Sequence, residues 1–550
     1  MLSRNIIILF MVMLLSPLSV HAEMFAPEVK TVSGIEKLEQ KKTIDAPTEI
    51  MTVVVPQKIV PIVIGNEKTT EQTFDDKVNE YFKPISDTSL EIVFYSITVG
   101  NQTIPLILVW LVFASIFFTF YMRFVNVALF KHGIDLVRGK FDKTDGNNAG
   151  QINRFQALTT SLSGTVGLGN IAGVAVAISV GGPGAMFWMM LMGFFGMSAK
   201  FVECSLGVKY RHQTEDGRMF GGPMFYLRDG FKEFGSKMGL FGKLMGGFFA
   251  LCCIGGSLGG GNMFQANQAY GQLVNITGGD ASFWADKGWL FGVILSALVG
   301  GVIIGGIKTI ANVASKIVPF MAAIYLIAGL VLLIMNSAEV PAAFGAIFKG
   351  AFGIDAVAGG FLGAVIQGVR RAAFSNEAGI GSAAIAHAAA KTDNAVSQGL
   401  VAMLGPFIDT VIICTMTALV IVVSGVYVEG GGMEGVELTS RAFESAFSWF
   451  PYVLTLAVIL FAFSTMIAWS YYGVKAFTYL FGESVKSEMS FKILFCLFVI
   501  VGASAKLGNV INFTDAMIFA MAVPNIVGLY LLAPGLKRDL LAYCKQIKAA

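Results

Sequence analysis

A run of small and polar residues interrupts an apolar stretch between Ser163 and Gly173. It reads Ser-Gly-Thr-Val-Gly-Leu-Gly-Asn-Ile-Ala-Gly, and glycines this close together predict that a helix unwinds there. Unwinding frees backbone N–H groups, which attract a carboxylate, and C=O groups, which can coordinate a desolvated cation. Asn170 adds a side-chain oxygen and Thr165 a hydroxyl at the same depth. The run therefore predicts a site for an amino acid together with Na⁺.

A second glycine cluster lies in a later apolar stretch, where Gly359, Gly360, Gly363 and Gly368 surround Gln367. The two stretches are five apart in the order of apolar segments. Glycine-interrupted helices at corresponding places in two five-helix halves are typical of transporters with inverted repeats. Most of the 63 glycines have a simpler interpretation, because small residues let helices pack closely in lipid.

Apolar stretches of about 20 residues must position these clusters. The chain has 550 residues, of which 55% are hydrophobic and only 14% charged, too few charges to cover a water-exposed globule of this size. In lipid the backbone must satisfy its own hydrogen bonds, and the length of the stretches favours helices over barrel strands. The sequence therefore predicts an all-α membrane protein with about eleven transmembrane helices. The expected spans are 104–124, 155–179, 184–208, 244–272, 289–306, 311–336, 355–374, 397–424, 449–481, 489–508 and 513–534.

Lysine and arginine residues fall in alternate connections between these spans, and the other connections are acidic or nearly neutral. By the positive-inside rule, this pattern puts the N-terminus in the periplasm and the C-terminal tail, residues 536–550, in the cytoplasm of a bacterial inner membrane. Arg370, Arg371 and Glu377 follow the seventh span, and we interpret them as gating or topology-setting residues at the cytoplasmic mouth.

The first 103 residues read as an exported segment. Residues 1–22 have the pattern of a secretory signal peptide, with a basic start, an apolar core and Val20-His21-Ala22 as the cleavage site; an uncleaved anchor is the alternative. Residues 23–103 are polar and predict a poorly ordered periplasmic tail with short strands at Met51–Val55 and Ile59–Ile64. We find no chemistry in this tail.

Composition and motifs argue against several other classes of function. The formal net charge of +3 is too small to indicate a nucleic-acid partner. The six cysteines sit in or beside apolar segments and the four histidines are scattered, so neither a disulfide framework nor a zinc site is indicated. An intramembrane protease would need His-Glu-x-x-His, a Ser/His pair or two aspartates, and none is present. A passive channel would need a continuous polar pore, whereas the two glycine breaks are isolated at the midplane.

Charged residues inside the spans need partners. Asp409 lies near the middle of the eighth span, where a carboxylate must pair, take up a proton or hold a cation. A structural partner and a coupling role are both open for it. Lys200 and Glu203 lie one helical turn apart in the third span and predict a local ion pair.

Long runs of the sequence resemble the alanine-or-glycine:cation symporter family. These runs are Thr160 through Arg211, Gly221-Gly222-Pro223-Met224, Gln367 through Ser382, and Phe461 through Gly473. The resemblance extends over residues 104–535. It implies a leucine-transporter-like fold, in which one extra helix at 104–124 precedes two inverted five-helix repeats at 155–336 and 355–535.

The same resemblance implies a transporter and not an enzyme: symport of small neutral amino acids, chiefly alanine and glycine, by alternating access. The implied coupling ion is Na⁺, with no other cofactor. Proton coupling in the same fold is the alternative, with Asp409 as the carrier. Membrane lipid is the remaining partner.

The resemblance also implies roles for individual residues. The run from Val166 to Asn170 resembles the broken first helix of the neurotransmitter:sodium symporters, where carbonyls before the break bind sodium and glycine amides face the substrate carboxylate. The implied sodium ligands are Ser163, Val166, Asn170, Ser464 and Thr465. The implied substrate contacts are Thr165, Gly167, Gly169, Asn170, Phe264, Gln265, Asn267, Gln367 and Trp469.

Overall fold

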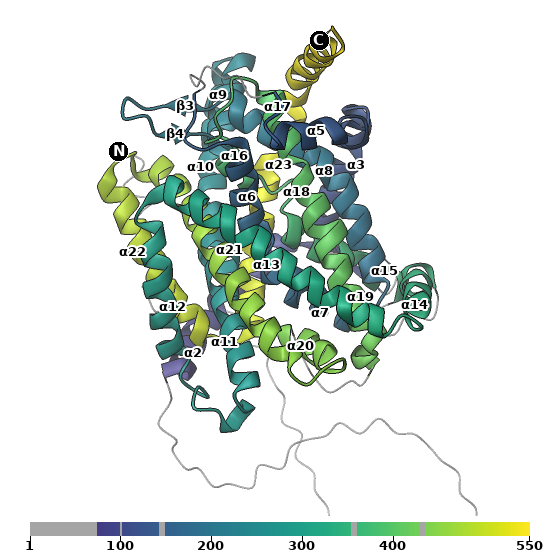
Figure 1. Ribbon diagram of the computed structural model, residues 1–550. Coiled ribbons are helices and arrows are strands. Elements are labelled where there is room, and N and C mark those ends of the chain that lie inside the picture. Colours follow the sequence, from purple (N-terminus) through teal and green to yellow (C-terminus); the bar gives the residue numbers. More distant parts are fainter. Residues whose placement is uncertain (1–73, 100–101, 142–148, 354–359, 429–434, 550) are drawn as a thin grey trace, which may run out of the picture. The chain divides into compact units, whose positions relative to one another are not determined.

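Helices make up almost all of the described chain in the computed structural model (Figure 1), which confirms the expected all-α fold. The predicted signal peptide at 1–22 and the predicted strands at Met51–Val55 and Ile59–Ile64 lie outside the described residues. The structure describes residues 74–99, 102–141, 149–353, 360–428 and 435–549.

The first part of the chain contains helices α2 to α13. These are α2 (Phe74–Val93), α3 (Leu106–Tyr121), α4 (Val125–Ala128), α5 (Phe130–Val137), α6 (Arg154–Thr165), α7 (Ala172–Gly181), α8 (Ala185–Lys209), α9 (Pro223–Gly230), α10 (Ser236–Leu258), α11 (Phe264–Ile276), α12 (Gly288–Ile303) and α13 (Gly306–Met335). Short turns between them are η1 (Leu168–Asn170), η2 (Phe231–Phe234), η4 (Gly279–Ala281) and the π-helical η3 (Gly259–Met263). The antiparallel strand pairs are β1 (Ser96–Val99) with β2 (Gln102–Pro105), and β3 (His212–Gln213) with β4 (Met219–Phe220).

The second part contains helices α14 to α23. These are α14 (Val340–Phe352), α15 (Gly360–Asn376), α16 (Ser382–His387), α17 (Ala395–Ala402), α18 (Leu404–Pro406), α19 (Thr415–Ser424), α20 (Val436–Glu444), α21 (Phe450–Phe481), α22 (Val485–Ser504) and α23 (Leu507–Ala549). The π-helical turn η5 (Phe407–Cys414) and the 3-10 turn η6 (Val426–Val428) flank α19.

Among the described residues, seven helices are long and apolar enough to cross a membrane, and the bent pair α6–α7 makes an eighth. Shorter apolar helices are α3, α12 and α14. On α13, Phe320, Ile327 and Ile334 follow one another at seven-residue spacing and are 57%, 61% and 71% exposed. A stripe of exposed apolar residues on one helix face would be unfavourable in water, and lipid is the solvent that it fits.

Two groups of helices pack around the middle of the molecule. In the first group, α8 packs along both α15 and α17, and α7 packs on α15. In the second group, α12 packs along α22, and α10 packs along α21. Helix α21 also contacts α6. The interrupted helices α6–α7 and α15–α16 therefore both belong to the first group, and the first of them faces α21 of the second.

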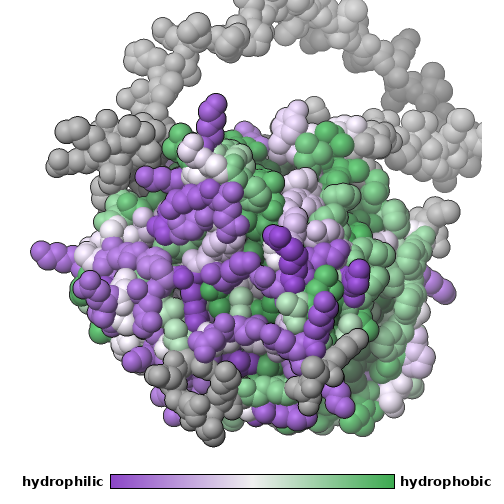
Figure 2. Space-filling view, turned by 90° about the horizontal axis from the view of Figure 1, so that it is seen from above, coloured by the Kyte–Doolittle hydropathy of each residue, from purple (hydrophilic) through white to green (hydrophobic). Residues whose placement is uncertain are grey.

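The helices α5, α9 and α17 and the β3–β4 hairpin lie at one end of the bundle, and α14 and α20 lie at the other (Figure 1). Contacts from α23 tie its C-terminal part to the first end: Asp539 pairs with Lys209 (2.6 Å), and the hydroxyl of Tyr543 contacts Nε2 of His132 (2.9 Å). Viewed onto this end, polar side chains gather over its middle and hydrophobic side chains along one rim (Figure 2).

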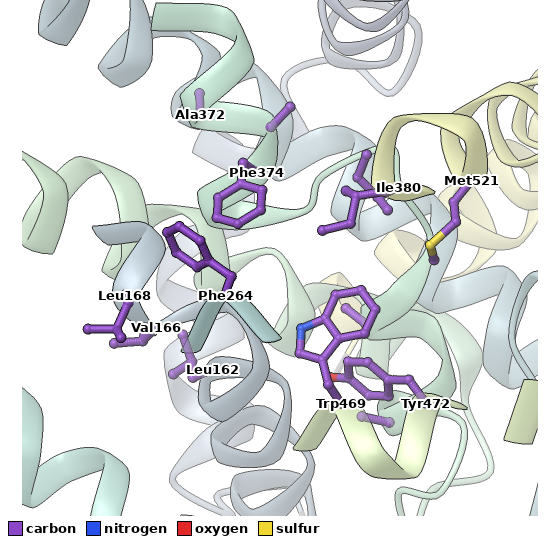
Figure 3. Packing of buried hydrophobic residues seen from close by; sticks show 14 of the residues in the cluster. Leu162, Val166, Leu168, Phe264, Ala372, Phe374, Ile380, Trp469, Tyr472 and Met521 are labelled. Carbon is purple, nitrogen blue, oxygen red and sulfur yellow. The ribbon is translucent and has the colours of Figure 1, made fainter. Parts of the chain in front are cut away.

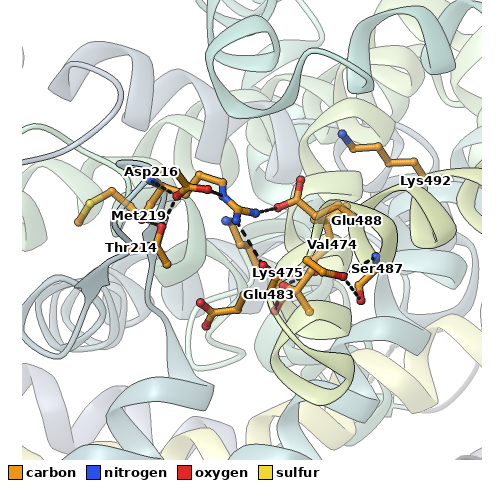
Figure 4. A network of polar contacts seen from close by, with 12 residues as sticks. Thr214, Asp216, Met219, Val474, Lys475, Glu483, Ser487, Glu488 and Lys492 are labelled. Carbon is orange, nitrogen blue, oxygen red and sulfur yellow. Dashed lines mark hydrogen bonds and ion pairs between the residues drawn. The ribbon is translucent and has the colours of Figure 1, made fainter.

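The tip of the β3–β4 hairpin is attached to the junction of α21 and α22 (Figure 4). The guanidinium of Arg218 contacts Asp216 in its own hairpin (2.6 Å), Glu488 of α22 (2.8 Å) and the carbonyl of Glu483 (3.2 Å). A hydrogen bond from Thr214 lowers the pKa of Asp216, burial partly opposes this effect, and Arg218 lowers the pKa further. The charged hairpin, which lies in the connection after α8, therefore links that connection to helices α21 and α22.

Residues 74–99 and 102–105 form a helix and a pair of antiparallel strands where the polar composition predicts a tail. Helix α2 packs along α23, and the buried Ser86 hydroxyl donates to the carbonyl of Asn509 (2.8 Å). Directly after α2, the ring of Phe94 contacts the ring of Phe519 edge-on (5.1 Å between centroids), and the guanidinium of Arg370 lies over Phe94 (4.6 Å). The segment is polar overall because only one side of α2 is buried, which is why composition does not reveal it.

Candidate substrate and cation site

The first helix break lies between α6 and α7, whose axes differ by 57°. The side-chain oxygen of Asn170 accepts a hydrogen bond from the N–H of Gly167 (3.0 Å), and its amide nitrogen donates to the backbone carbonyl of Asp409 (3.2 Å). The N–H of Leu168 donates to the side chain of Gln265 (3.1 Å). Side chains thus satisfy backbone groups that the unwinding exposes, as burial in lipid requires.

The second break lies between α15 and α16. Glu377, Gly379 and Gly381 have φ angles of 55°, 81° and 95°, a left-handed conformation that glycine adopts without strain and glutamate rarely adopts. The N–H of Gly379 donates to the Glu203 carboxylate (3.1 Å), and its carbonyl accepts from the amide of Asn525 (2.9 Å). The break is therefore held by α8 on one side and by α23 on the other.

This position corrects the break expected around Gln367. Residues 360–376 form the continuous helix α15. Gly368 serves close helix packing, because a Cβ there would lie 2.5 Å from the carbonyl oxygen of Ala185 in α8. Gln367 itself lies beside Gly181 at the end of α7 and does not line the pocket at which the two breaks meet.

The charged residues expected at the cytoplasmic mouth are also placed differently. Arg370 and Arg371 lie within α15 and both pair with the buried Asp515 of α23, with a distance of 2.7 Å from Arg370. Glu377 lies at the second break. A partner 144 residues away neutralises Arg371 inside the bundle, so its charge does not mark a connection.

The two breaks meet at a small pocket of about 10 Å³. Such a cavity has room for about one water molecule. Its walls come from α6, both breaks, η3, α11, α15, α21 and α23. The lining residues are Gly164, Thr165, Gly167, Gly169, Gly260, Gln265, Phe374, Glu377, Thr465, Trp469 and Ile518.

Trp469 and Glu377 contact each other at this pocket. The indole Nε1 of Trp469 donates to the Glu377 carboxylate (3.0 Å) and lies within hydrogen-bond distance of the carbonyl of Gly164 (3.2 Å). The other oxygen of Glu377 accepts from the hydroxyl of Ser382. Glu377 is only 2% exposed. The second break therefore presents a buried carboxylate toward the first.

The expected sodium ligands on α6 and α21 lie side by side. The hydroxyl of Ser163 donates to the carbonyl of Ser464 (2.6 Å), and the Thr465 hydroxyl is the nearest atom that a Cβ on Gly167 would meet. The buried Thr465 hydroxyl has no hydrogen-bond partner among the described residues. The Ser464 hydroxyl instead bonds back to the carbonyl of Phe461 (3.0 Å), a common arrangement in helices. Val166 is fully buried at the end of α6.

Asp409 lies behind the first break, on the π-helical turn η5. One carboxylate oxygen accepts from Thr410 (2.8 Å) and from the hydroxyl of Ser375 on α15. Its other oxygen has no hydrogen-bond partner in the described parts of the chain, and the residue is fully buried. A carboxylate oxygen without a hydrogen-bond partner next to two hydroxyls suits a hard cation, whereas Asn170 presents its donor nitrogen here.

The candidates from α11 divide into two groups. Gln265 lines the pocket, and the ring of Phe264 meets that of Phe374 edge-on at 5.3 Å (Figure 3). Asn267 points elsewhere: its amide donates to the carbonyl of Ala505 (2.5 Å), and it lines a separate, open groove of about 390 Å³ between α11, α20 and the start of α23. The sequence reading missed Glu377 and Phe374 as pocket residues. The motif Gly379-Ile380-Gly381, which parallels Gly167-Leu168-Gly169, is the signal that could have located them.

Comparison with known proteins identifies the family. The model of the sodium:alanine symporter family matches residues 90–550. The sodium/alanine symporter AgcS of Methanococcus maripaludis is 41% identical over 432 residues, 78% of this chain and 92% of AgcS. The "Probable sodium/glutamine symporter GlnT" of Bacillus subtilis is 34% identical over 446 residues, 81% of this chain and 89% of GlnT. Among solved structures, the crystal structure of MhsT in complex with L-phenylalanine is similar with a TM-score of 0.49 and 15% identity, over 70% of this chain and 90% of that chain. This multi-pass membrane protein therefore belongs to the sodium:alanine symporter family, a family of sodium-coupled amino-acid symporters and not of enzymes.

Proposed function

We propose that the protein imports a small neutral amino acid, alanine or glycine, together with Na⁺ by alternating access. One observation carries this proposal: two interrupted helices meet at one small pocket that Thr465 and Trp469 also line. The backbone amides at the first break, which donate to the side chains of Asn170 and Gln265, suit a substrate carboxylate that replaces these acceptors, and the adjoining hydroxyls and carbonyls suit Na⁺. The name of AgcS as a sodium/alanine symporter supports the same substrate and ion.

The two bound species stabilise each other in this proposal. Sodium at Ser163, Val166 and Thr465 holds the break in the shape that exposes its amides, so it raises the affinity for the amino acid. By linkage, the amino acid raises the affinity for sodium by the same factor. Asp409 offers a further position for a cation, and it is also the group that would carry a proton if coupling were to H⁺.

The proposed orientation puts the N-terminus in the periplasm and the C-terminus in the cytoplasm of a bacterial inner membrane. Its support is the distribution of charge. The basic connections of α5, α8 and α9 share one end of the bundle with the C-terminal part of α23 (Figure 1), as the positive-inside rule expects of a cytoplasmic face. Residues 1–22 would then be the signal peptide that exports the N-terminal segment.

Uptake of labelled alanine into proteoliposomes tests the proposal. We expect accumulation with an inward Na⁺ gradient and none with an equal K⁺ gradient. Unlabelled glycine should compete. Unlabelled glutamine, the substrate in the name of GlnT, should not compete, because the side chains of Phe374, Trp469 and Ile518 limit the size of the pocket.

Two results would contradict parts of the proposal. Uptake that ignores Na⁺ but follows an imposed pH gradient, and that is lost in Asp409→Asn, would move coupling to protons. Uptake of glutamine in preference to alanine would reject the small substrate while leaving sodium symport in place.

A further inference from the structure

The buried charges around the two breaks do not balance. Lys200 pairs with Glu203 (3.3 Å) inside α8, and Asp515 pairs with Arg370 and Arg371. Two other fully buried carboxylates lie close to the breaks. Within the described residues, neither Glu377 nor Asp409 has a basic side chain at ion-pair distance.

An unpaired carboxylate inside a membrane bundle is costly, and it persists when a ligand supplies the missing positive charge. The two carboxylates are not equivalent in this respect. Glu377 lines the pocket, whereas Asp409 lies behind the first break among hydroxyls. A ligand in the pocket therefore faces Glu377.

The backbone conformation of Glu377 also supports a ligand site. Its φ of 55° is a left-handed conformation that asparagine and glycine adopt more readily than glutamate. Such outliers cluster at ligand sites, where the surrounding structure holds them. Here the conformation directs the carboxylate toward Trp469 and Ser382, which hold its two oxygens. Each oxygen of an ionised carboxylate has two lone pairs, so both retain capacity for a further donor.

We infer that Glu377 receives the α-ammonium group of the transported amino acid and so makes that amine a requirement for binding. The inference rests on the proposed function and deepens it. The substrate carboxylate would face Gly167 and Gly169 in the first break and its ammonium would face the second, so one zwitterion spans both. A monocarboxylate without the amine would leave Glu377 unpaired and add a second negative charge beside it.

Ligand-induced thermal shifts of the purified protein in detergent, with saturating Na⁺, test this inference. The ligands are alanine and propionate, which differ in the amine alone. We expect wild type to prefer alanine by more than about 100-fold, since loss of one partner from a buried charged pair costs that order of affinity. In Glu377→Gln the preference should fall below about fivefold, because the neutral amide does not distinguish the two ligands by charge. Glu339→Gln, the same substitution at an exposed glutamate before α14, is the matched control, and it should keep the preference for alanine.

The outcomes separate this inference from the proposed function. If wild type binds no small amino acid in the presence of Na⁺, the proposed function fails first. If wild type prefers alanine and Glu377→Gln keeps that preference, the assignment of Glu377 alone is overturned. Should Glu377→Gln not fold, Ser382→Ala takes its place: removal of this hydroxyl from the carboxylate should lower the affinity for alanine several-fold and leave that for propionate unchanged. An equal effect on both ligands would reject the inference.

Discussion

Asn170 closes the first helix break with both ends of its amide. The oxygen accepts from Gly167, and the nitrogen donates to the carbonyl of Asp409 and lies 3.4 Å from the sulfur of Cys414. At the scale of single residues, the site therefore contains two kinds of polar group. Some form hydrogen bonds with the unwound backbone, and others remain free to bind a ligand.

The Asn170→Ala variant should lose these contacts. We expect it to be less stable by about 1–3 kcal/mol, because it removes two buried hydrogen bonds. Sodium-dependent alanine uptake should fall while the protein stays in the membrane. Uptake in vesicles, normalised to protein content, measures the effect, with Asn312→Ala on the exposed face of α13 as the control. Normal uptake with unchanged Na⁺ dependence would remove Asn170 from the site.

A substitution at Gly167 tests the closeness of α6 and α21. A Cβ at this position would collide with the Thr465 hydroxyl and lie 3.2 Å from Oε1 of Gln265. We expect Gly167→Ala to reduce alanine uptake at least about tenfold by pushing α21 away from the break, since such overpacking costs about 1–3 kcal/mol. Gly247→Ala on α10, where a Cβ meets open space, is the matched control and should transport normally. Equal uptake by both variants would contradict the close approach.

At the scale of elements, the sequence located the first break better than the second. The run around Asn170 is local: glycines and one amide stand out against apolar neighbours, and the unwinding follows from them. The second break follows Arg370 and Arg371. Their charges indicate a loop between two membrane spans when the sequence is considered alone, because their partner, Asp515, lies in a different helix. The hydropathy of one segment does not show whether a residue of opposite charge on another segment neutralises its charged residues.

The same limit applies to side-chain direction. Gln265 and Asn267 are two positions apart on α11, which puts their side chains about 200° apart around the helix, so only one of them can reach the pocket and the other reaches an outer groove. Which of the two side chains meets the pocket depends on the π-helical turn η3 directly before α11, and the residue pattern does not predict that turn.

The β3–β4 hairpin offers a prediction about an element. Arg218→Ala should release the hairpin tip from the α21–α22 junction and leave α8 and α9 in place. We expect faster cleavage by a protease within residues 210–221 and little change in thermal stability, because partly exposed ion pairs contribute only about 0–1 kcal/mol. Lys237→Ala, at the start of α10, serves as the control. Unchanged cleavage in Arg218→Ala would show that the tip is held by other contacts.

At the scale of the whole molecule, helix α2 adds to the helical bundle that the family model describes. The family model matches from residue 90, so α2 lies almost entirely before the matched region. Its contact with the bundle ends at Phe94, between Phe519 and the guanidinium of Arg370, and Arg370 leads to Asp515. The segment therefore reaches a buried ion pair of the transport domain.

Removal of the Phe94 ring tests this connection. Phe94→Ala should lower the free energy of unfolding by about 1–3 kcal/mol, because it deletes an aromatic contact and a cation–π contact from a partly buried site. The melting temperature in detergent measures it. Tyr95→Ala, whose side chain is 69% exposed, should change the melting temperature little. Similar effects of the two variants would mean that α2 is attached elsewhere.

The small volume of the pocket has a consequence for measured affinity. A space of about 10 Å³ does not admit alanine, so this conformer is not the one that binds. The substrate must select a wider conformer, and the apparent dissociation constant equals the intrinsic one divided by the fraction of molecules in that conformer. A variant that only raises this fraction would gain affinity without touching the ligand. Tight binding in a mutant of this transporter is therefore evidence for a shifted population as much as for a better contact.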